Sequence, residues 1–225
     1  MFTDRRDAGR QLARLLVPSA GPTPVVVALP RGGVPVAAEV ADRLGAPLDI
    51  IVVRKLGSRW QPELGVGAIA EGDVRVLNET LVRAEGMSAQ DIDVVTAREQ
   101  AELERRVRRY RGGRPPVDVA GRPVIVVDDG LATGYTARAA IEALRRRGAT
   151  RITLAVPVAP EDASQAMLDV VDEVVVVETP AWFFAIGEFY EDFSQTTDDE
   201  VDALLAANGR AHGGTTGRLE PAAPG

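Results

Sequence analysis

The sequence predicts an α/β fold: a doubly wound, mostly parallel sheet of about five strands flanked by helices. The first observation is a series of short, continuous apolar runs rich in branched side chains, at residues 25–29, 48–53, 123–127, 151–158 and 173–178. Such runs are typical of strands that are buried on both faces. The second observation is that a helical stretch separates each run from the next. Strands that alternate with helices along a chain indicate a mostly parallel sheet.

The helices are predicted from spacing and from boundary residues. Leu12, Leu15 and Leu16 fall on one face of an N-terminal helix. Gly45 is a suitable residue to follow a helix C-terminus, and Ser88 with Asp91 resembles a capping box. The predicted helices are residues 5–16, 34–44, 88–111, 136–147, 161–170 and an acidic helix that ends near Ala207.

Length and composition favour one soluble domain. The chain has 225 residues, of which 45% are hydrophobic and 26% charged, and its net charge is −7. We expect a single domain over residues 1–207 and a disordered tail over 208–225, where Gly, Ala, Pro and Thr dominate. The acidic balance makes a nucleic-acid partner unexpected and gives no reason to expect an anionic membrane surface.

Several kinds of chemistry are excluded by residue counts. The chain has no cysteine, which excludes disulfides, thiolate metal sites and a cysteine nucleophile. His212 is the only histidine and lies in the expected tail, so a Ser-His-Asp triad is implausible. No apolar run reaches membrane-spanning length, and charged residues at 4–7 interrupt the N-terminus. We therefore expect a cytoplasmic protein.

The stretch VIVVDDGLATGYT (124–136) carries the strongest functional signal. Asp128 and Asp129 stand at the carboxyl end of a predicted strand, the edge at which open α/β sheets bind ligands. The Gly- and Thr-rich turn that follows would present backbone N–H groups and a helix N-terminus to an anion. The acids would accept hydrogen bonds from sugar hydroxyls, so the motif fits a ribose 5-phosphate. The alternative for the motif alone is an ordinary helix start with two solvated acids.

This stretch resembles the signature of the type I phosphoribosyltransferases, which bind 5-phosphoribosyl 1-pyrophosphate (PRPP). The resemblance implies that Asp128 and Asp129 orient the ribose. It also implies that the following residues hold the 5-phosphate: Gly130, Leu131, Ala132, Thr133, Gly134, Tyr135 and Thr136. The competing motifs, a GxGxxG fingerprint after a strand and a GxxxxGK[ST] P-loop, are absent.

Two further segments fall where this family needs cations. The PRGG segment after the first strand resembles the pyrophosphate loop: Gly32 and Gly33 allow close approach to an anion, and Arg31 adds charge. Arg54 and Lys55 end the second predicted strand, and Lys55 is the only lysine in the chain. The resemblance implies that these cations stabilise the departing pyrophosphate, although a plain turn and a surface lysine are the alternatives.

The resemblance also implies the reaction and its accessories. A nucleophile would displace pyrophosphate at C1 of the ribose, a reaction of nucleotide salvage. Mg²⁺ would be held mainly by PRPP and water, with Asp128 and Asp129 nearby and no direct protein ligands. Residues 57–73 resemble the flexible loop that closes over the reaction centre and excludes water. We expect the chain to return from this loop through a short pair of strands near 66–77. Because a neighbouring subunit often completes such loops in this family, we expect a homodimer.

The acceptor is not determined by the sequence. The aromatic segment 180–193 resembles the hood of the 6-oxopurine enzymes, in which a ring such as Trp182 or Phe183 stacks on the base. The alternative is that these rings cap the sheet edge as core. Ala132 stands where those enzymes have an acid and instead resembles the adenine and uracil enzymes. We therefore expect a nitrogenous base or related small acceptor and name no base.

A second class of function competes with the transferase. A PRPP-sensing regulator would keep the same site and bind RNA or control transcription. Its basic face would be ELERRVRRYRGGR (102–114), where Tyr110 would interleave with bases. Glutamates on the same helix favour a salt-bridged, solvated face instead.

Overall fold

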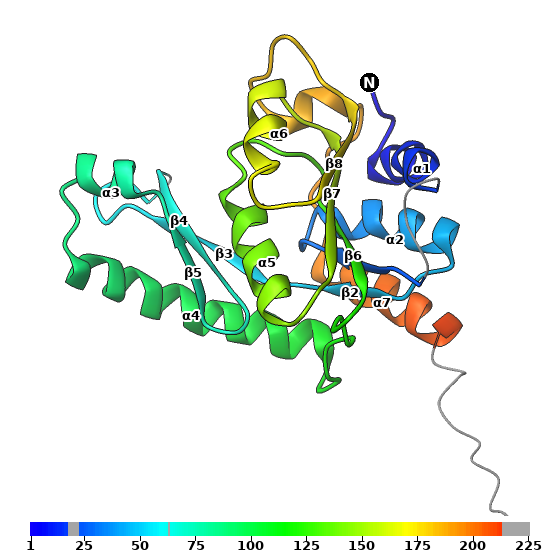
Figure 1. Cartoon of the computed structure of the whole chain (residues 1–225), viewed down its shortest axis with the longest axis horizontal. Helices are drawn as coiled ribbons and strands as arrows, with labels where there is room; N and C mark the ends of the chain where they lie inside the picture. Colours follow the sequence, from blue (N-terminus) through cyan, green and yellow to red (C-terminus); the bar gives the residue numbers. More distant parts are fainter. Residues whose placement is uncertain (18–22, 63, 213–225) are drawn as a thin grey trace, which may run out of the picture.

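A central sheet of five parallel strands confirms the predicted fold class (Figure 1). The computed structural model describes residues 1–17, 23–62 and 64–212. The strand order is β2-β1-β6-β7-β8. The strands are β1 (Val25–Ala28), β2 (Leu48–Ile50), β6 (Pro123–Val127), β7 (Arg151–Val158) and β8 (Glu173–Glu178).

Alternate residues of the strands enter two separate cores. Val26 and Ala28 pack with α1 (Arg5–Leu16), α2 (Gly33–Leu44) and α7 (Asp198–His212) on one face of the sheet. Val25 and Val27 pack with α5 (Tyr135–Arg146) on the other face. The short helix α6 (Glu161–Met167) follows β7, and its Met167 joins this second core. Because both faces are covered, the inner strands β1 and β6 are apolar at every position, which explains their continuous runs in the sequence.

A second, three-stranded antiparallel sheet corrects the predicted course of residues 48–77. The strands are β3 (Val53–Gly57), β4 (Gly65–Ala70) and β5 (Val74–Leu77), with β4 in the middle. The predicted strand 48–53 leaves the central sheet after Ile50, so Arg54 and Lys55 belong to the small sheet. Much of the loop predicted at 57–73 is strand β4, and the connection from β3 to β4 is limited to residues 58–64.

Helix α4 (Ala89–Arg111) runs along the small sheet and ends at the central one (Figure 1). It begins with the predicted capping box between Ser88 and Asp91. At its other end the buried Arg111 binds Asp49 of β2, Glu71 of the β4–β5 turn and the carbonyl oxygen of Ile50. One guanidinium therefore ties both sheets to the end of α4. The preceding short helix is α3 (Glu79–Ala84).

The last helix is longer than predicted. α7 continues through His212, so the expected boundary at residue 207 falls inside a helix. The reason is that Asn208 is buried and binds the backbone of β2, with its Oδ1 accepting from Leu48 N at 2.8 Å. The rest of the expected tail, 213–225, lies outside the described residues. None of the helices described has the length and apolar character needed to cross a membrane.

Candidate active site

The loop from Asp128 to Gly134 lies at the carboxyl edge of the central sheet, as predicted. Asp128 follows β6 directly, and Leu131 N donates to the carbonyl of Val158 at the end of β7. Gly134 has a φ of +75° immediately before α5, a conformation that glycine adopts without strain. Ala132 and Thr133 are exposed. The turn therefore offers an accessible loop in front of a helix N-terminus, the arrangement that suits an anion.

The PRGG segment packs directly against the two acids. β1 and β6 pair in register from Val25↔Val124 to Ala28↔Val127, and Leu29 N donates to the carbonyl of Val127. A Cβ atom on Gly32 would overlap the carboxylate of Asp129, and one on Gly33 would lie 2.7 Å from the carbonyl oxygen of Val127. Glycine is thus required at both positions by the closeness of the two loops. The peptide bond between Pro30 and Arg31 is cis.

Arg5 is the site residue that the sequence did not reveal. Its Nε donates to Oδ2 of Asp129 at 2.8 Å, and the two side chains are only 11% and 13% exposed. Its Nη1 donates to the carbonyl of Ser194 at 2.7 Å, and its guanidinium lies 3.9 Å from the ring centre of Phe193. No local motif could have identified it, because Arg5 stands 124 residues before its partner.

The segment 186–194, which includes the 3₁₀ helix η1 (Ile186–Phe189), covers the acidic loop. The Tyr190 hydroxyl donates to the backbone carbonyl of Asp129 at 2.6 Å. Ile186 lies so close to Gly130 that a Cβ there would be 2.6 Å from its Cγ2. Burial raises the pKa of Tyr190, so its hydroxyl stays a donor. These contacts give the aromatic segment a structural role at the loop.

The two predicted base-stacking residues differ in their surroundings. Phe183 is partly buried and stacks on Phe189, with ring centres 5.6 Å apart and planes 15° from parallel. Trp182 is 81% exposed. Of these two candidates, Trp182 is the one whose ring is free to meet a ligand.

Burial dominates the electrostatics of the acidic pair. Burial, and then the neighbouring charge of Asp129, raise the pKa of Asp128 well above its ordinary value. Burial also raises the pKa of Asp129, and the Arg5 guanidinium opposes that rise. Asp128 Oδ1 accepts from the backbone N–H of Asp129 at 2.9 Å. Strongly perturbed carboxyls at a ligand-binding edge are a physical signature of a functional site.

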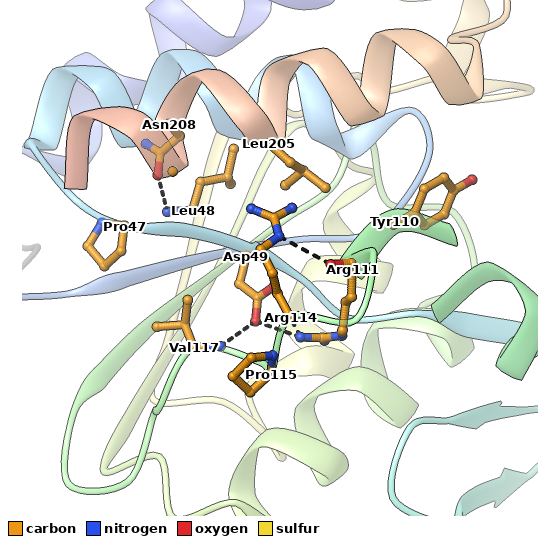
Figure 2. Close-up of a pocket in the computed structure, with 11 residues that line it drawn as sticks. Pro47, Leu48, Asp49, Tyr110, Arg111, Arg114, Pro115, Val117, Leu205 and Asn208 are labelled. Atoms are coloured by element: carbon orange, nitrogen blue, oxygen red, sulfur yellow. Dashed lines mark hydrogen bonds and ion pairs between the residues drawn. The ribbon is translucent and has the colours of Figure 1, made fainter. Parts of the chain in front are cut away.

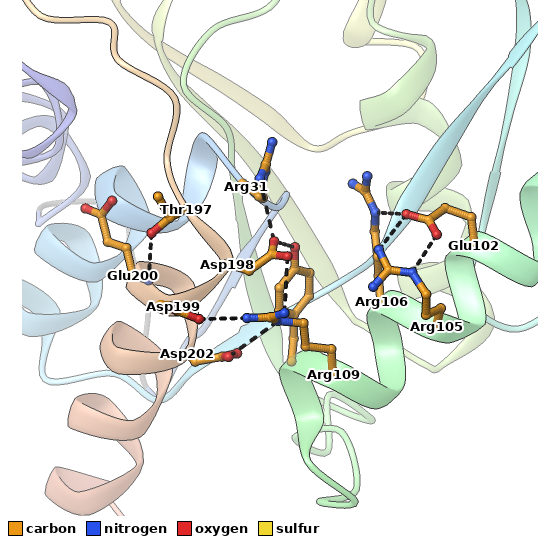
Figure 3. A network of polar contacts seen from close by, with 11 residues as sticks. Arg31, Glu102, Arg105, Arg106, Arg109, Thr197, Asp198, Asp199, Glu200 and Asp202 are labelled. Atoms are coloured by element: carbon orange, nitrogen blue, oxygen red, sulfur yellow. Dashed lines mark hydrogen bonds and ion pairs between the residues drawn. The ribbon is translucent and has the colours of Figure 1, made fainter.

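The predicted cations are arranged in two places. Arg31 lies in the PRGG loop beside the acids, and its Nη1 is 3.7 Å from Oδ1 of Asp198 at the start of α7 (Figure 3). Arg54 pairs instead with Glu99 of α4 at 2.7 Å. Lys55 lies against Gly65, where a Cβ would overlap its Cε, and it lines a cavity between the small sheet and α4. The structure therefore brings the loop that carries Arg31 to the acids, while the Arg31 side chain pairs with Asp198. Arg54 and Lys55 have other neighbours.

Comparisons with known proteins agree with this geometry. The family model described as the phosphoribosyl transferase domain matches residues 6–194. Two curated relatives from Mycobacterium tuberculosis, strains CDC 1551 and H37Rv, carry names that assign them provisionally to the phosphoribosyl transferases. Each is 51% identical over 212 residues, which are 94% of this chain and 47% of the relative. The chain thus spans about half the length of the curated relatives it matches.

The crystal structure of TT1426 from Thermus thermophilus is similar to this one with a TM-score of 0.79 and 42% identity, over 92% of this chain and 98% of that chain. A uracil phosphoribosyltransferase from Lactobacillus delbrueckii subsp. bulgaricus is 52% identical over 54 residues, 24% of this chain and 26% of the relative. The extent of the family match decides the classification: this chain belongs to the phosphoribosyl transferase family. The resemblance inferred from residues 124–136 is confirmed.

Asp128→Asn is expected to stabilise the protein at neutral pH. A carboxyl whose folded-state pKa is raised stabilises the fold below its unfolded pKa, near 3.8, and that stability is lost as pH rises through the raised folded pKa. Asparagine keeps the acceptor for Asp129 N without the charge. Urea unfolding at pH 7.5 should show a higher free energy of unfolding for the variant than for the wild type, because burial disfavours the charged form of Asp128. The gain should disappear below pH about 4.

The control is Asp169→Asn, which neutralises an exposed aspartate just after α6 and should leave stability nearly unchanged. A loss of stability in Asp128→Asn at neutral pH would contradict the electrostatic description of the pair.

Arg5→Gln is expected to destabilise the fold by about 3 kcal/mol, because it leaves a buried carboxylate without its cation. Arg6→Gln is the matched control: Arg6 is the next residue, is half-exposed and pairs loosely with Glu39 at 3.4 Å. It should cost less than about 1 kcal/mol. A double-mutant cycle of Arg5→Gln with Asp129→Asn should return a coupling energy of at least about 1 kcal/mol. Equal losses in the two single arginine variants would refute the special role of Arg5.

Proposed function

We propose that this chain is a phosphoribosyltransferase that uses PRPP with Mg²⁺ and transfers the 5-phosphoribosyl group to a nitrogenous base or related small acceptor. The observation that carries the proposal is the packing of Gly32 and Gly33 against Asp129 and Asp128 at the carboxyl edge of β1 and β6. The two acids suit the ribose hydroxyls of PRPP. The loop on one side of them suits its 5-phosphate, and the PRGG loop on the other side suits its pyrophosphate. Family membership supports the same reading, while the activity of the whole protein is part of the proposal.

Each part of the site has a role in the proposed reaction. Asp128 and Asp129 accept hydrogen bonds from the ribose hydroxyls and fix the sugar ring. Backbone amides of the loop that ends at Gly134, with the hydroxyls of Thr133 and Thr136, hold the 5-phosphate. The bond from C1 to the pyrophosphate oxygen breaks with its electron pair left on pyrophosphate, and a bond from C1 to the acceptor nitrogen forms. The proton that the acceptor nitrogen loses passes to the released pyrophosphate. Arg31 and the adjoining glycine amides stabilise the charge that develops on pyrophosphate.

The residues present fit a Mg²⁺ ion that the substrate brings. Mg²⁺ keeps several waters and favours phosphate oxygens with one or two carboxylates over an all-protein cage. Among the residues described, no group of three or more His, Cys, Asp and Glu side chains is placed to hold a metal. Asp128 and Asp129 are the carboxylates near such an ion, and one oxygen of Asp129 is already bound to Arg5. When bound, the ion neutralises charge on the leaving group.

The acceptor is left at the level of its class. Exposure of Trp182 supports stacking on a planar acceptor. Ala132, together with the local similarity to a uracil phosphoribosyltransferase, supports a pyrimidine as readily as a purine. A homodimer that completes the site stays a prediction.

The regulatory alternative has no specific observation in its favour. The arginines of α4 that would form its basic face are paired: Arg105 and Arg106 with Glu102, and Arg109 with acids of α7 (Figure 3). Tyr110, expected to interleave with bases, is buried and donates to Asp198 at 2.6 Å. The helix therefore presents a salt-bridged surface of mixed charge to solvent.

Calorimetric titration of PRPP with and without Mg²⁺ tests the proposal. We expect saturable binding that depends on Mg²⁺ and is abolished in the Asp128→Asn, Asp129→Asn double variant, because the ribose hydroxyls lose their acceptors. Circular dichroism of the variant should remain that of a folded protein. Wild-type affinity in the double variant, or no binding by the native chain, would overturn the proposal. Positive binding would lead to a screen of purines and pyrimidines by pyrophosphate release.

Lys55→Ala is expected to slow pyrophosphate departure more than it weakens PRPP binding, if the small sheet carries its cation to the leaving group. Single-turnover kinetics separate the two effects. Arg75→Ala removes an exposed cation of the same sheet, paired with Asp93, and is the matched control. Equal rates of pyrophosphate departure in the two variants would show that Lys55 has no role in catalysis.

A further inference from the structure

A cavity of about 260 Å³ lies at the outer edge of the central sheet, away from the acidic loop (Figure 2). It is bounded by the start of β2, by the end of α4 with the turn that follows it, and by the second half of α7. β1 separates β2 from β6, and the cavity shares no residue with the Asp128–Gly134 loop. In Figure 2, Leu205 and Asn208 point from α7 toward β2 across this space.

The hydrogen-bond acceptors recorded around this cavity are already engaged. Asp49 accepts from Nη1 of Arg111 with both oxygens, at 3.1 and 3.3 Å, and Oδ2 also accepts from Val117 N at 2.8 Å. Asn208 binds Leu48 N and the carbonyl of Ala46. A ligand that brought mainly donors would therefore find these acceptors occupied.

The arginine side chains at this cavity, in contrast, have hydrogen-bond donors to offer a ligand. Nε of Arg114 donates to the carbonyl of Arg111 at 3.1 Å. Arg114 is exposed, and this is the one hydrogen bond found for its side chain among the described residues. Figure 2 shows this guanidinium between β2 and α7. Arg111 is only 6% exposed, and its Nε is the single buried side-chain nitrogen or oxygen of residues 1–17, 23–62 and 64–212 without a partner. An unpaired buried donor is destabilising by about 1–3 kcal/mol, so such a group calls for an acceptor.

The remaining walls are apolar. Leu48, Val117 and Leu205 line the space between the polar groups. A planar guanidinium binds a carboxylate or phosphate with two parallel hydrogen bonds. We propose that this cavity is a regulatory site for a small organic anion, a carboxylate or phosphate on a compact apolar body, and that its occupancy is transmitted to Arg31.

The route to Arg31 is short. Tyr110 lines the cavity, and its hydroxyl donates to Asp198 at 2.6 Å. Asp198 in turn lies 3.7 Å from Arg31, in the loop that faces the proposed pyrophosphate position (Figure 3). The cavity is closed by α4 and α7, and the same two helices carry this hydrogen bond: Tyr110 belongs to α4 and Asp198 to α7. A ligand that moves Tyr110 or the second half of α7 changes the partner of Arg31.

The site itself is tested without any assumption about PRPP. Benzoate and phenyl phosphate are the probes for the two anionic groups, and benzyl alcohol is the uncharged control. We expect saturable binding of at least one anion, with shifts of the backbone amide signals of Leu48 and Asn208 in ¹H–¹⁵N spectra. Arg114→Gln should weaken that binding at least tenfold. Arg146→Gln removes the same charge from α5, outside the cavity, and should change it less than twofold.

The pattern of binding identifies the anionic group and decides the proposal. Preference for benzoate assigns a carboxylate ligand, and preference for phenyl phosphate assigns a phosphate. Equal binding of benzyl alcohol, unchanged affinity in Arg114→Gln, or no saturable binding of either anion would overturn the site.

Transmission is read first from the amide signals of Arg31 and Gly32, which should shift when the anion saturates the wild type. In Tyr110→Phe, which keeps the ring but loses the hydroxyl, the anion should still bind while those shifts disappear. Absence of shifts in the wild type would overturn the regulatory role.

A second readout rests on the proposed function: the saturating anion should change the affinity for PRPP with Mg²⁺ at least threefold in the wild type and not in Tyr110→Phe. If PRPP does not bind at all, the proposed function fails. The anion titration and the Arg31 signals then still decide the present inference.

Discussion

The in-register parallel pairing of β1 with β6 is the constraint on which the site depends. This pairing ends both strands at the same level, so the chain leaves each of them into the same small volume. The PRGG turn and the two aspartates then lie in contact, and side chains larger than hydrogen at residues 32 and 33 would collide with the acidic loop. Backbone geometry alone thus places one amide-rich turn against two carboxylates before any ligand arrives.

That closeness has an electrostatic consequence. Two neighbouring carboxyls are largely removed from water at the end of a buried strand, and desolvation opposes the ionisation of both. The charge of Asp129 further opposes the ionisation of Asp128. Arg5 supplies the compensating charge from the other end of the chain, and Phe193 and Ser194 hold its guanidinium in place. The acidic net charge of the whole protein therefore says little about the local field, which depends on one arginine that is far away in sequence.

Local patterns predicted the fold and the position of the acidic loop at the sheet edge because both depend on neighbours in sequence. The runs at 25–29 and 123–127 and the DDGLATGYT stretch combine strand, turn and helix start in a few consecutive residues. Arg5 could not be found in this way, because its role arises from tertiary packing. The strand pair expected near 66–77 is present as β4 and β5, where Gly67 allows β4 to approach β5 closely. The third strand, β3, was missed because residues 48–57 read as the end of a central strand followed by a loop. For the aromatic segment the sequence left two interpretations open, a base platform and rings that cap the sheet edge. Tyr190 and Phe193 fit the second, because they hold the acidic loop and its arginine, while base stacking by Trp182 or Phe183 stays a prediction.

Asn208 has a further meaning for the edge of the central sheet. β2 is the outermost strand on its side, and an outer strand exposes unpaired backbone groups to which another chain can add. The side-chain amide of Asn208 donates to the carbonyl of Ala46 and accepts from the N–H of Leu48, as a peptide group of a neighbouring strand would. One asparagine on α7 thus imitates one residue of a missing strand. It closes this border of the sheet against intermolecular strand addition and the aggregation that would follow.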